Sequence, residues 1–362
     1  MSKLDTLLQI WNSKQPFPEQ LQSRLDQKFT LEFNYNSNHI EGNQLTYGQT
    51  EILLLFGKVV SEANIRDLEE MKSHDVALKL MISEAKESDK PLTEVFIRQL
   101  HQIMFREDYE EYRTLPDGST YSYTVHVGRY KTRHNSVRTK TGELFEYASP
   151  EETPGLMYDL VKWYNEEAEK RVLSPIELAA LFHYRYIRIH PFEDGNGRVS
   201  RLLMNFILLR HNYPMIVVRH KDKDRYLGAL GKADANVDPR PSFGAQASIS
   251  QITPFLDYIN KTMEQEIEDN LSFIDEAAEN VWWFNGEFIK FRSENTRKIL
   301  NLLTEHPGIT VRELVDEVGI NKSAIQKQLQ NLQKHEYIIR TKGRRGSWHV
   351  AIVCTTNKGG TK

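Results

Sequence analysis

Apolar residues recur at helical spacing along most of this chain. In residues 93–105, TEVFIRQLHQIMF, one helical face collects Val95, Ile97, Leu100, Ile103 and Met104. The same spacing predicts helices at residues 154–168, 175–188, 198–210, 224–232 and about 252–291. Residues 6–90 also fit helices, with a break at the polar residues 34–46. The pattern therefore predicts a mostly α-helical core.

Two local signals interrupt this helical pattern. Ser174 can cap the helix that begins at Pro175, and Glu177 completes a capping box with it. Residues 107–150 are rich in Thr, Tyr, Val and Gly and contain two turn-forming pairs, Asp117-Gly118 and Thr141-Gly142. We therefore expect turns and a β-hairpin between the helices at 93–105 and 154–168.

A separate domain is predicted from residue 293 onward. A helix at 296–305 stops at His306-Pro307-Gly308, and two short helices follow at 311–317 and 322–334. Strands at 337–340 and 348–353 then enclose a basic loop. This order resembles a winged helix. The core residues that it predicts are Leu314, Ile325, Leu329, Leu332 and Ile338.

The second helix of this domain and its loop carry an excess of basic residues. The exposed face of that helix is expected to present Ser323, Gln326, Lys327 and Gln330. In a winged helix these elements contact the major groove and the backbone of DNA, which makes Lys327, Arg344 and Arg345 candidate contacts. Winged helices also serve as protein-docking or dimer modules, so both kinds of partner stay open.

Composition narrows the class of protein. Hydrophobic residues make up 39% and charged residues 27%, as in ordinary water-soluble domains. A formal net charge of -3 argues against a protein that coats nucleic acid with its whole surface. No segment reads as a secretory signal or a bilayer span, and Cys354 is the only cysteine, which excludes an internal disulfide and a thiolate metal cluster. We expect a cytoplasmic protein without membrane contact.

Residues 190–201, HPFEDGNGRVSR, form the segment richest in candidate chemistry. They lie between two predicted helices, so they form a loop that feeds the start of the second. Gly195 and Gly197 let the backbone approach a ligand closely, and amides at a helix start form an anion site. Asn196, Arg198 and Arg201 add donors beside it. Such a loop favours a multiply charged anion, for example a di- or triphosphate.

Asp194 and His190 supply the other parts of a phosphoryl-transfer site. Polyphosphates normally arrive with Mg²⁺, and the Asp194 carboxylate can hold that ion through one oxygen. His190 titrates near neutrality and can accept a proton from an attacking hydroxyl. Positioning and charge stabilisation do most of the remaining work in this chemistry.

The same segment matches, without a departure, the signature H-x-F-x-D-G-N-G-R-x-x-R, and in this the chain resembles the Fic-domain family (filamentation induced by cAMP). The resemblance implies an all-helical core, ATP with Mg²⁺, and transfer of AMP to a Ser, Thr or Tyr hydroxyl of a target protein. It makes His190 the general base and Asp194 the magnesium ligand. Asn196 and the backbone from Gly195 to Arg198 then cradle the α- and β-phosphates. Arg198 touches the β-phosphate, and Arg201 grips the γ-phosphate.

The resemblance extends to a flap and a base pocket. Gly128-Arg129-Tyr130-Lys131 and the residues after it look like the family's flap, which pairs with an extended target segment by strand addition. This implies target docking at Val137, Thr139 and Gly142. Tyr226 and Asp234 fall where relatives place residues that face the adenine. Relatives often carry Asn at the second position, so the Asp leaves base preference open.

Residues 37–42, SNHIEG, resemble the family's inhibitory motif, (S/T)-x-x-x-E-(G/N), which begins here at Ser37. In relatives that carry it, the glutamate pairs with the second arginine of the signature, which implies that Glu41 pairs with Arg201. An arginine held by a carboxylate cannot also hold a γ-phosphate. Relatives whose motif precedes the signature are called class II.

Together these observations predict a Fic-type helical core with a β-hairpin flap. The predicted parts are an N-terminal helical region with the inhibitory helix (1–92), a catalytic core (93–262), a connecting helix (263–292), a winged helix-turn-helix domain (293–356) and a tail (357–362). The leading hypothesis is a protein adenylyltransferase restrained by Glu41. The alternative is a DNA-binding transcriptional regulator whose core senses nucleotide; the intact His190 favours the enzyme. The expected partners are a target protein, the chain itself through self-modification or as a homodimer, and DNA.

Overall fold

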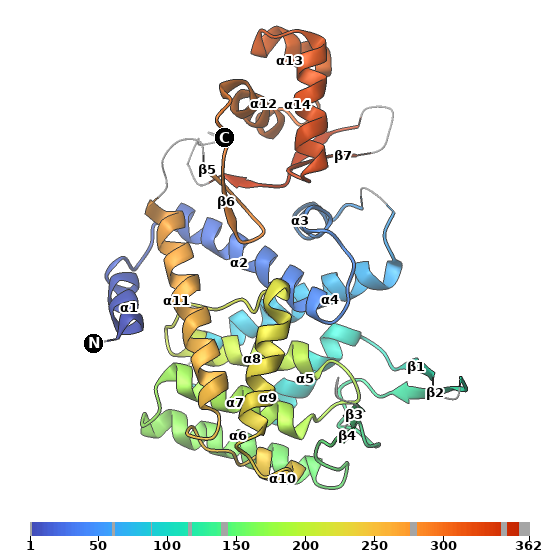
Figure 1. Cartoon of the computed structure of the whole chain (residues 1–362), viewed down its shortest axis with the longest axis vertical. Helices are drawn as coiled ribbons and strands as arrows, with labels where there is room; N and C mark the ends of the chain where they lie inside the picture. Colours follow the sequence, from blue (N-terminus) through green and yellow to red (C-terminus); the bar gives the residue numbers. More distant parts are fainter. Residues whose placement is uncertain are drawn as a thin grey trace. The chain divides into compact units, whose positions relative to one another are not determined.

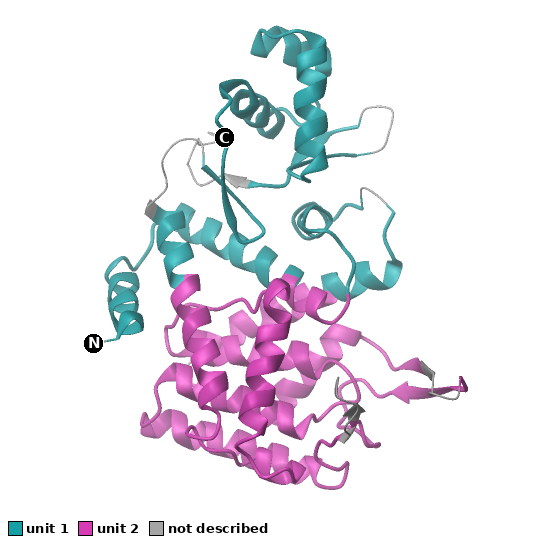
Figure 2. Ribbon diagram, in the orientation of Figure 1, with its two compact units in different colours: residues 1–35, 43–72, 267–362 teal, residues 36–42, 73–266 magenta. Residues whose placement is uncertain are grey.

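The computed structural model describes residues 2–59, 62–87, 89–114, 118–138, 144–275, 281–341 and 346–354. Helices dominate it, as the hydrophobic pattern predicts (Figure 1). The chain divides into two compact units (Figure 2): unit 1 comprises residues 1–35, 43–72 and 267–362, and unit 2 comprises residues 36–42 and 73–266. This division differs from the predicted boundary at residue 92, because residues 36–42 and 73–92 belong to unit 2. None of the helices in the described ranges has the length and apolar character that a membrane crossing requires.

The middle of unit 2 is a set of packed helices. Neighbours in sequence pack on one another, since α6 contacts α7 and α7 contacts α8. Unit 2 also takes in the last turn of α2 and the larger parts of α4 and α11, whose other residues belong to unit 1. The helices that contribute to it are α2 (Glu19–Ile40), α4 (Ile65–Ala85), α5 (Glu94–Phe105), α6 (Thr153–Lys170), α7 (Pro175–Ile189), α8 (Asn196–Arg210), η1 (His220–Asp222), α9 (Lys223–Asp234), α10 (Pro241–Gly244) and α11 (Thr253–Asp275).

Helix α8 is the most enclosed of these helices. Its residues from Val199 to Leu208 are all buried, polar ones included. The helix begins at Asn196 rather than at residue 198, because Gly195 adopts φ 76° and serves as its N-cap. Tight packing on every side therefore fixes the direction in which the first turn of α8 points.

The predicted capping box of α7 is confirmed. Ser174 Oγ accepts a hydrogen bond from Glu177 N (3.3 Å), and Glu177 Oε2 accepts one from Ser174 N (2.8 Å). We expect Ser174→Ala to lower the free energy of unfolding by about 1 kcal/mol, because an orphan amide loses its acceptor. Urea unfolding measures this change. Ser83→Ala, at an exposed helical position of the same unit, is the matched control and should leave stability nearly unchanged.

Residues 107–150 form strands and turns, as predicted. β1 (Tyr109–Thr114) and β2 (Thr120–Val125) make one antiparallel hairpin. β3 (Val137–Arg138) and β4 (Leu144–Phe145) make a second, short antiparallel pair. The segment thus contains two hairpins, and the second one falls where the flap is predicted.

The predicted break at residues 34–46 is wrong for its first half, because α2 continues to Ile40. Asn34, Asn36, Ser37 and Asn38 are polar but at most 2% exposed. Within unit 2, Asn36 Oδ1 accepts a hydrogen bond from His220 N (3.0 Å). Polarity here reflects buried hydrogen bonding rather than a solvent-exposed loop.

Unit 1 contains the winged helix. Its helices α12 (Glu294–Glu305), α13 (Val311–Val318) and α14 (Lys322–Lys334) precede the paired strands β7 (Ile338–Arg340) and β8 (Trp348–Val350). The predicted core residues are confirmed: Leu314, Ile325, Leu329, Leu332 and Ile338 form one buried cluster. Unit 1 also holds α1 (Lys3–Ser13) and α3 (Tyr47–Phe56).

The predicted helix at 252–291, and with it the connecting helix at 263–292, ends early. α11 stops at Asp275, and β5 (Val281–Phe284) and β6 (Glu287–Lys290) form a hairpin. Asn285 and Gly286 make its two-residue turn with φ 46° and 84°, a geometry that favours Asn-Gly. β9 (Val353–Cys354) also pairs with β5, and Trp282 lies in the winged-helix cluster. The hairpin therefore packs with the winged helix.

Candidate functional site

The turn between α7 and α8 brings together the residues of segment 190–201. His190 ends α7 in the left-handed conformation, with φ 52° and ψ 60°. The Asn196 side chain closes the turn, because it accepts a hydrogen bond from Phe192 N (2.9 Å) and donates one to Phe192 O (2.7 Å). His190, the candidate proton acceptor, therefore lies at one end of this turn, and the start of α8 lies at the other. The hydrogen bonds between Asn196 and Phe192 hold the turn in shape.

The His190 imidazole is partly buried and held on one face by an aromatic ring. It stacks on Tyr147, with centroids 3.9 Å apart and planes at 15°. Nδ1 lies 3.4 Å from Ile187 O. Because a carbonyl oxygen only accepts, that contact requires a proton on Nδ1 and leaves Nε2 as the basic nitrogen. Burial, and next the charge of Lys131, lower the pKa of His190 to about 3, so the ring is neutral at pH 7.

Asp194 presents an ionised carboxylate at the start of α8. Its Oδ2 accepts a hydrogen bond from Tyr109 Oη (2.7 Å) and lies 3.6 Å from Arg198 Nη2, while Oδ1 accepts one from Gly195 N (2.6 Å). Burial acts to raise the pKa of Asp194, but Arg198 and the two hydrogen bonds hold it below its usual value. The side chain is 40% exposed, so this carboxylate is open to a cation. A carboxylate oxygen is the kind of donor that Mg²⁺ prefers, so this side chain could hold that ion.

The first turn of α8 has the form of an anion cradle. Its first backbone hydrogen bond runs from Val199 N to Gly195 O (3.0 Å), and the preceding amides lack an intrahelical partner, as at any helix start. Two glycines of this turn have close neighbours, and Gly195 also holds a left-handed φ of 76°. A Cβ at Gly195 would meet the Phe105 ring, and one at Gly197 would meet the Glu41 carboxylate. The Arg198 guanidinium lies over the ring of Phe105, 4.7 Å from its centroid.

Arg201 is bound by the residues that the inhibitory motif names. It is 1% exposed; its Nε donates to Ser37 Oγ (3.0 Å), and its Nη2 donates to Ser37 O (2.9 Å) and to Glu41 Oε1 (2.7 Å). Burial acts to raise the pKa of Glu41, but the charges of Arg201 and Arg198 hold it below its usual value. Since Glu41 also lies against Gly197, an ionised carboxylate stands at the positive end of α8.

The two predicted base-facing residues differ in accessibility. Tyr226 is 2% exposed, and its hydroxyl lies 2.9 Å from His183 Nε2, so that hydroxyl points into the core rather than toward an open pocket. Asp234 is partly exposed; its Oδ1 accepts hydrogen bonds from Tyr184 Oη (2.7 Å) and Arg188 Nη1 (3.2 Å). Burial raises the pKa of Asp234, although both partners oppose the rise.

The remaining predicted residues lie in the flap and the winged helix. Val137 belongs to β3, where its backbone pairs with Phe145. Thr139 and Gly142 fall outside the described residues, as do Arg344 and Arg345. Lys327 is exposed on α14, together with Ser323, Gln326 and Gln330, as predicted.

Two aromatic contacts at the site are not among those that the sequence predicts. Tyr147 stacks on His190, and the Tyr109 hydroxyl bonds to Asp194. Both residues come from the tyrosine-rich segment 107–150, whose composition predicts strands and turns but no contact with the site. The only sequence signal for these contacts is the repeated tyrosine in a loop-rich segment that adjoins a helical core.

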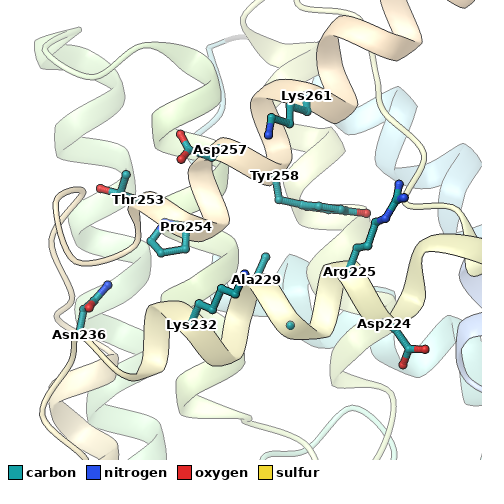
Figure 3. A pocket seen from close by; sticks show the side chains of 11 residues that line it. Asp224, Arg225, Ala229, Lys232, Asn236, Thr253, Pro254, Asp257, Tyr258 and Lys261 are labelled. Atoms are coloured by element: carbon teal, nitrogen blue, oxygen red, sulfur yellow. The ribbon is translucent and has the colours of Figure 1, made fainter.

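A separate groove of about 710 Å³ lies between α9 and α11 (Figure 3). Charged side chains of Arg225, Lys232, Asp257 and Lys261 line it beside the ring of Tyr258. None of the residues predicted for phosphate or base binding lines this groove. Tyr226 and Asp234, on the same helix α9, bond to side chains of α7 instead.

Family models match two parts of the chain. The model described as Fic/DOC family matches residues 91–208, and the model described as winged helix-turn-helix DNA-binding matches residues 292–339. The first match spans the turn and cradle described above. The second spans α12 to β7.

Curated relatives carry the name protein adenylyltransferase. The chain is 28% identical to protein adenylyltransferase fic-1 of Caenorhabditis elegans over 249 residues, 68% of this chain and 42% of that protein. It is 29% identical to protein adenylyltransferase Fic of Nematostella vectensis over 238 residues, 66% of this chain and 48% of that protein. The chain thus matches less than half the length of these relatives.

Solved structures share the fold. Fic-1 (residues 134–508) of C. elegans matches with a TM-score of 0.59 at 23% identity, over 76% of this chain and 73% of that one. The crystal structure of a Fic-domain-containing signalling protein of Bacteroides thetaiotaomicron matches with a TM-score of 0.70 at 49% identity, over 75% of this chain and 96% of that one. With nearly all of that protein matched at this identity, the chain belongs to the Fic family.

Proposed function

We propose that this chain transfers AMP from Mg-ATP to a Ser, Thr or Tyr hydroxyl of a target protein. The observation that carries the proposal is the position of the neutral His190 imidazole. It lies at one end of the turn between α7 and α8, and the start of α8 lies at the other end. A neutral base, an anion cradle and an ionised carboxylate within one turn are the parts that nucleotide transfer needs. Relatives named protein adenylyltransferase support the same reaction.

In the proposed mechanism the amides from Gly195 to Arg198 hold the α- and β-phosphates, and Asn196 keeps the turn closed. Arg198 binds the β-phosphate and Arg201 the γ-phosphate. His190 Nε2 accepts the proton of the target hydroxyl as its oxygen attacks the α-phosphorus. The bond from that phosphorus to the bridging oxygen breaks, and pyrophosphate leaves. Asp194 would hold Mg²⁺, which supplies charge neutralisation for the phosphates when it is bound.

We further propose that Glu41 restrains this reaction. Arg201 cannot bind a γ-phosphate while it donates to Glu41 and Ser37, and the Glu41 carboxylate repels an anion approaching Gly197. ATP would then bind weakly or with its α-phosphate turned away from in-line attack. Residues 36–42 are part of unit 2 together with the site, which supports a restraint built into this unit.

Target recognition is proposed at the flap. A short edge such as β3, in which Val137 pairs with Phe145, can accept an extended peptide by strand addition. Thr139 and Gly142, the other docking residues that the resemblance implies, follow Val137 in the sequence and lie outside the described residues. The acceptor hydroxyl would be presented to His190 in this way.

Mass spectrometry of the full chain incubated with Mg-ATP tests the reaction. We expect the Glu41→Gly form to gain AMP on a tyrosine, serine or threonine, through self-modification, and to modify a protein in a cell lysate. Binding of ATP without any transfer, to itself or to a lysate protein, would instead support the alternative of a nucleotide sensor.

DNA binding by the winged helix is the second candidate function. The exposed polar face of α14, with Lys327 at its centre, favours it. We expect affinity for duplex DNA that falls as salt rises, and Lys327→Glu should weaken binding to all sequences and reduce the salt slope by about 1. Lys162→Glu, on an exposed face of α6, is the control. Absence of binding at low salt would point to a protein-docking module.

A further inference from the structure

We propose that Lys131 and Asn135, in the segment that joins β2 to β3, are positioning residues that hold His190 in its working conformation. This inference rests on the proposed function, because it assigns a role in the same reaction. Neither residue belongs to the signature at 190–201. Together they form a bracket, which we call the 131/135 bracket, against the backbone of residues 189–192.

Each of the four backbone carbonyls from residue 189 to residue 192 accepts a hydrogen bond from the bracket. Lys131 Nζ donates to Ile189 O (3.0 Å) and Lys131 N to Pro191 O (2.8 Å). Asn135 Nδ2 donates to His190 O (3.1 Å) and to Phe192 O (2.9 Å). Lys131 Nζ also donates to Asn135 Oδ1 (2.9 Å), so the two side chains brace each other.

The backbone at this turn requires such support. The last carbonyls of α7 have no partner within the helix, so unsupported they would have to turn toward water. His190 itself holds φ 52°, a left-handed conformation that residues with a side chain seldom adopt. The 131/135 bracket supplies donors to these carbonyls and thereby makes the left-handed turn the favoured conformation.

The direction of the His190 ring depends on that turn. In the observed backbone position one face of the ring stacks on Tyr147, and Nδ1 lies next to Ile187 O. If the turn relaxed toward an ordinary helix end, both contacts would be lost and Nε2 would point elsewhere. A shift of about 1 Å in a reacting group can lower a rate about 100-fold.

The burial of Lys131 and the hydrogen bonds of its neighbours indicate that the 131/135 bracket is a specific part of the fold. Lys131 is only 3% exposed, although a lysine normally keeps its ammonium in water. Burial lowers the pKa of Lys131 to about 7, while the charge of Glu152 opposes that fall. The next residue along the chain is held by the same segment, because the Glu193 carboxylate accepts hydrogen bonds from His126 N (3.1 Å) and Thr132 Oγ1 (3.0 Å). The segment from 126 to 135 thus donates a hydrogen bond to every residue from 189 to 193.

The experiment compares Lys131→Met and Asn135→Ala, singly and together, in the Glu41→Gly form of the full chain. Self-labelling from ATP gives kcat and the KM for ATP, and a non-hydrolysable ATP analogue gives the affinity of the cradle. We expect kcat to fall by up to about 100-fold while the analogue binds as before. The double variant should lose little more than the worse single one, since the two side chains act as a unit.

Conservative replacements separate positioning from folding. Lys131→Arg keeps a donor for Ile189 O and should restore most of kcat. Asn135→Asp keeps the shape but places an acceptor against two carbonyls, and should be as slow as Asn135→Ala. Lys162→Met, an exposed lysine of α6, should change nothing. An unchanged kcat in Lys131→Met and Asn135→Ala, or an equal loss of analogue binding, would overturn the proposal.

A readout independent of AMP transfer keeps the two proposals distinguishable. Diethyl pyrocarbonate acylates neutral imidazole nitrogens, and mass spectrometry reports the rate at His190. We expect faster acylation of His190 in the bracket variants, because its ring leaves Tyr147. Failure of the Glu41→Gly form to transfer AMP refutes the proposed function alone. An acylation rate equal to that of the form with the bracket intact refutes the bracket alone.

Discussion

Replacing Glu41 with glycine is expected to raise AMP transfer from ATP about 10- to 100-fold. The substitution removes the carboxylate that accepts from Arg201 Nη2 at 2.7 Å and that lies against Gly197. A hydrogen bond to a charged group contributes about 1.5–3 kcal/mol, and each 1.4 kcal/mol corresponds to a factor of about ten. Arg201 then becomes available to the γ-phosphate. Incorporation of labelled AMP, measured as an initial rate at fixed ATP, checks this expectation.

Two further variants show which property of Glu41 matters. Glu41→Gln keeps an oxygen that can accept from Arg201 but removes the charge, so its rate should fall between the parent and Glu41→Gly. Ser37→Ala removes one acceptor and leaves Ser37 O and Glu41 in place, so its effect should be small. Labelling that stays at the parent level in Glu41→Gly would mean that Arg201 is not the group that limits transfer.

Sequence predicts the part of the site whose residues are close together in the chain. His190, Asp194 and Gly195 lie within one turn, so helix ends on either side decide their relative positions. Glycine is required at position 195, because its φ is 76° and a Cβ would meet the Phe105 ring, and a glycine is visible in a sequence. The pairing of Glu41 with Arg201, by contrast, came from the resemblance, because no spacing rule connects residues so far apart.

Side chains that reach the site from elsewhere could not be predicted. Tyr147, Tyr109 and Lys131 act through ring stacking or hydrogen bonds to residues distant in sequence. A lysine in a turn-rich segment reads as solvated, yet Lys131 is buried because backbone carbonyls at the end of α7 accept its protons. Only the fold shows that these carbonyls and this ammonium meet.

Two errors in the predicted fold arise because hydrophobicity alone does not show hydrogen-bond partners or turns. Polar residues at 34–46 suggested a loop, but Asn36 and Ser37 are polar because buried partners require donors and acceptors. Apolar residues at 281–284 suggested a continuing helix, although Asn285-Gly286 is a strong hairpin signal. Polar residues at the end of α2 are buried because they have hydrogen-bond partners, and the apolar residues 281–283 are buried as predicted, but in a strand that the Asn285-Gly286 turn sets.

Replacing His190 with alanine is expected to lower kcat about 100- to 10,000-fold, the range that a general base contributes. ATP affinity should change little, because the amides of α8 and the arginines remain. His134→Ala, an exposed histidine of the segment before β3, is the matched control and should retain the rate of its parent, the Glu41→Gly form. A His190→Ala variant that still labels itself at the parent rate would remove the base from the mechanism.

The pH dependence of the active form provides a second check on His190. The pKa of His190 is lowered to about 3, so the imidazole keeps its basic, neutral form as pH falls through its ordinary value of 6.5. A rate that depends on neutral His190 should therefore not fall between pH 7.5 and 5.5 through protonation of this ring. In Lys131→Met, which removes the second cause of the lowered pKa, the acidic limit of the rate should move upward. A rate that halves near pH 6.5 with the Lys131 charge in place would mean that His190 titrates as a solvated histidine, and that the neutral base inferred from its burial is wrong.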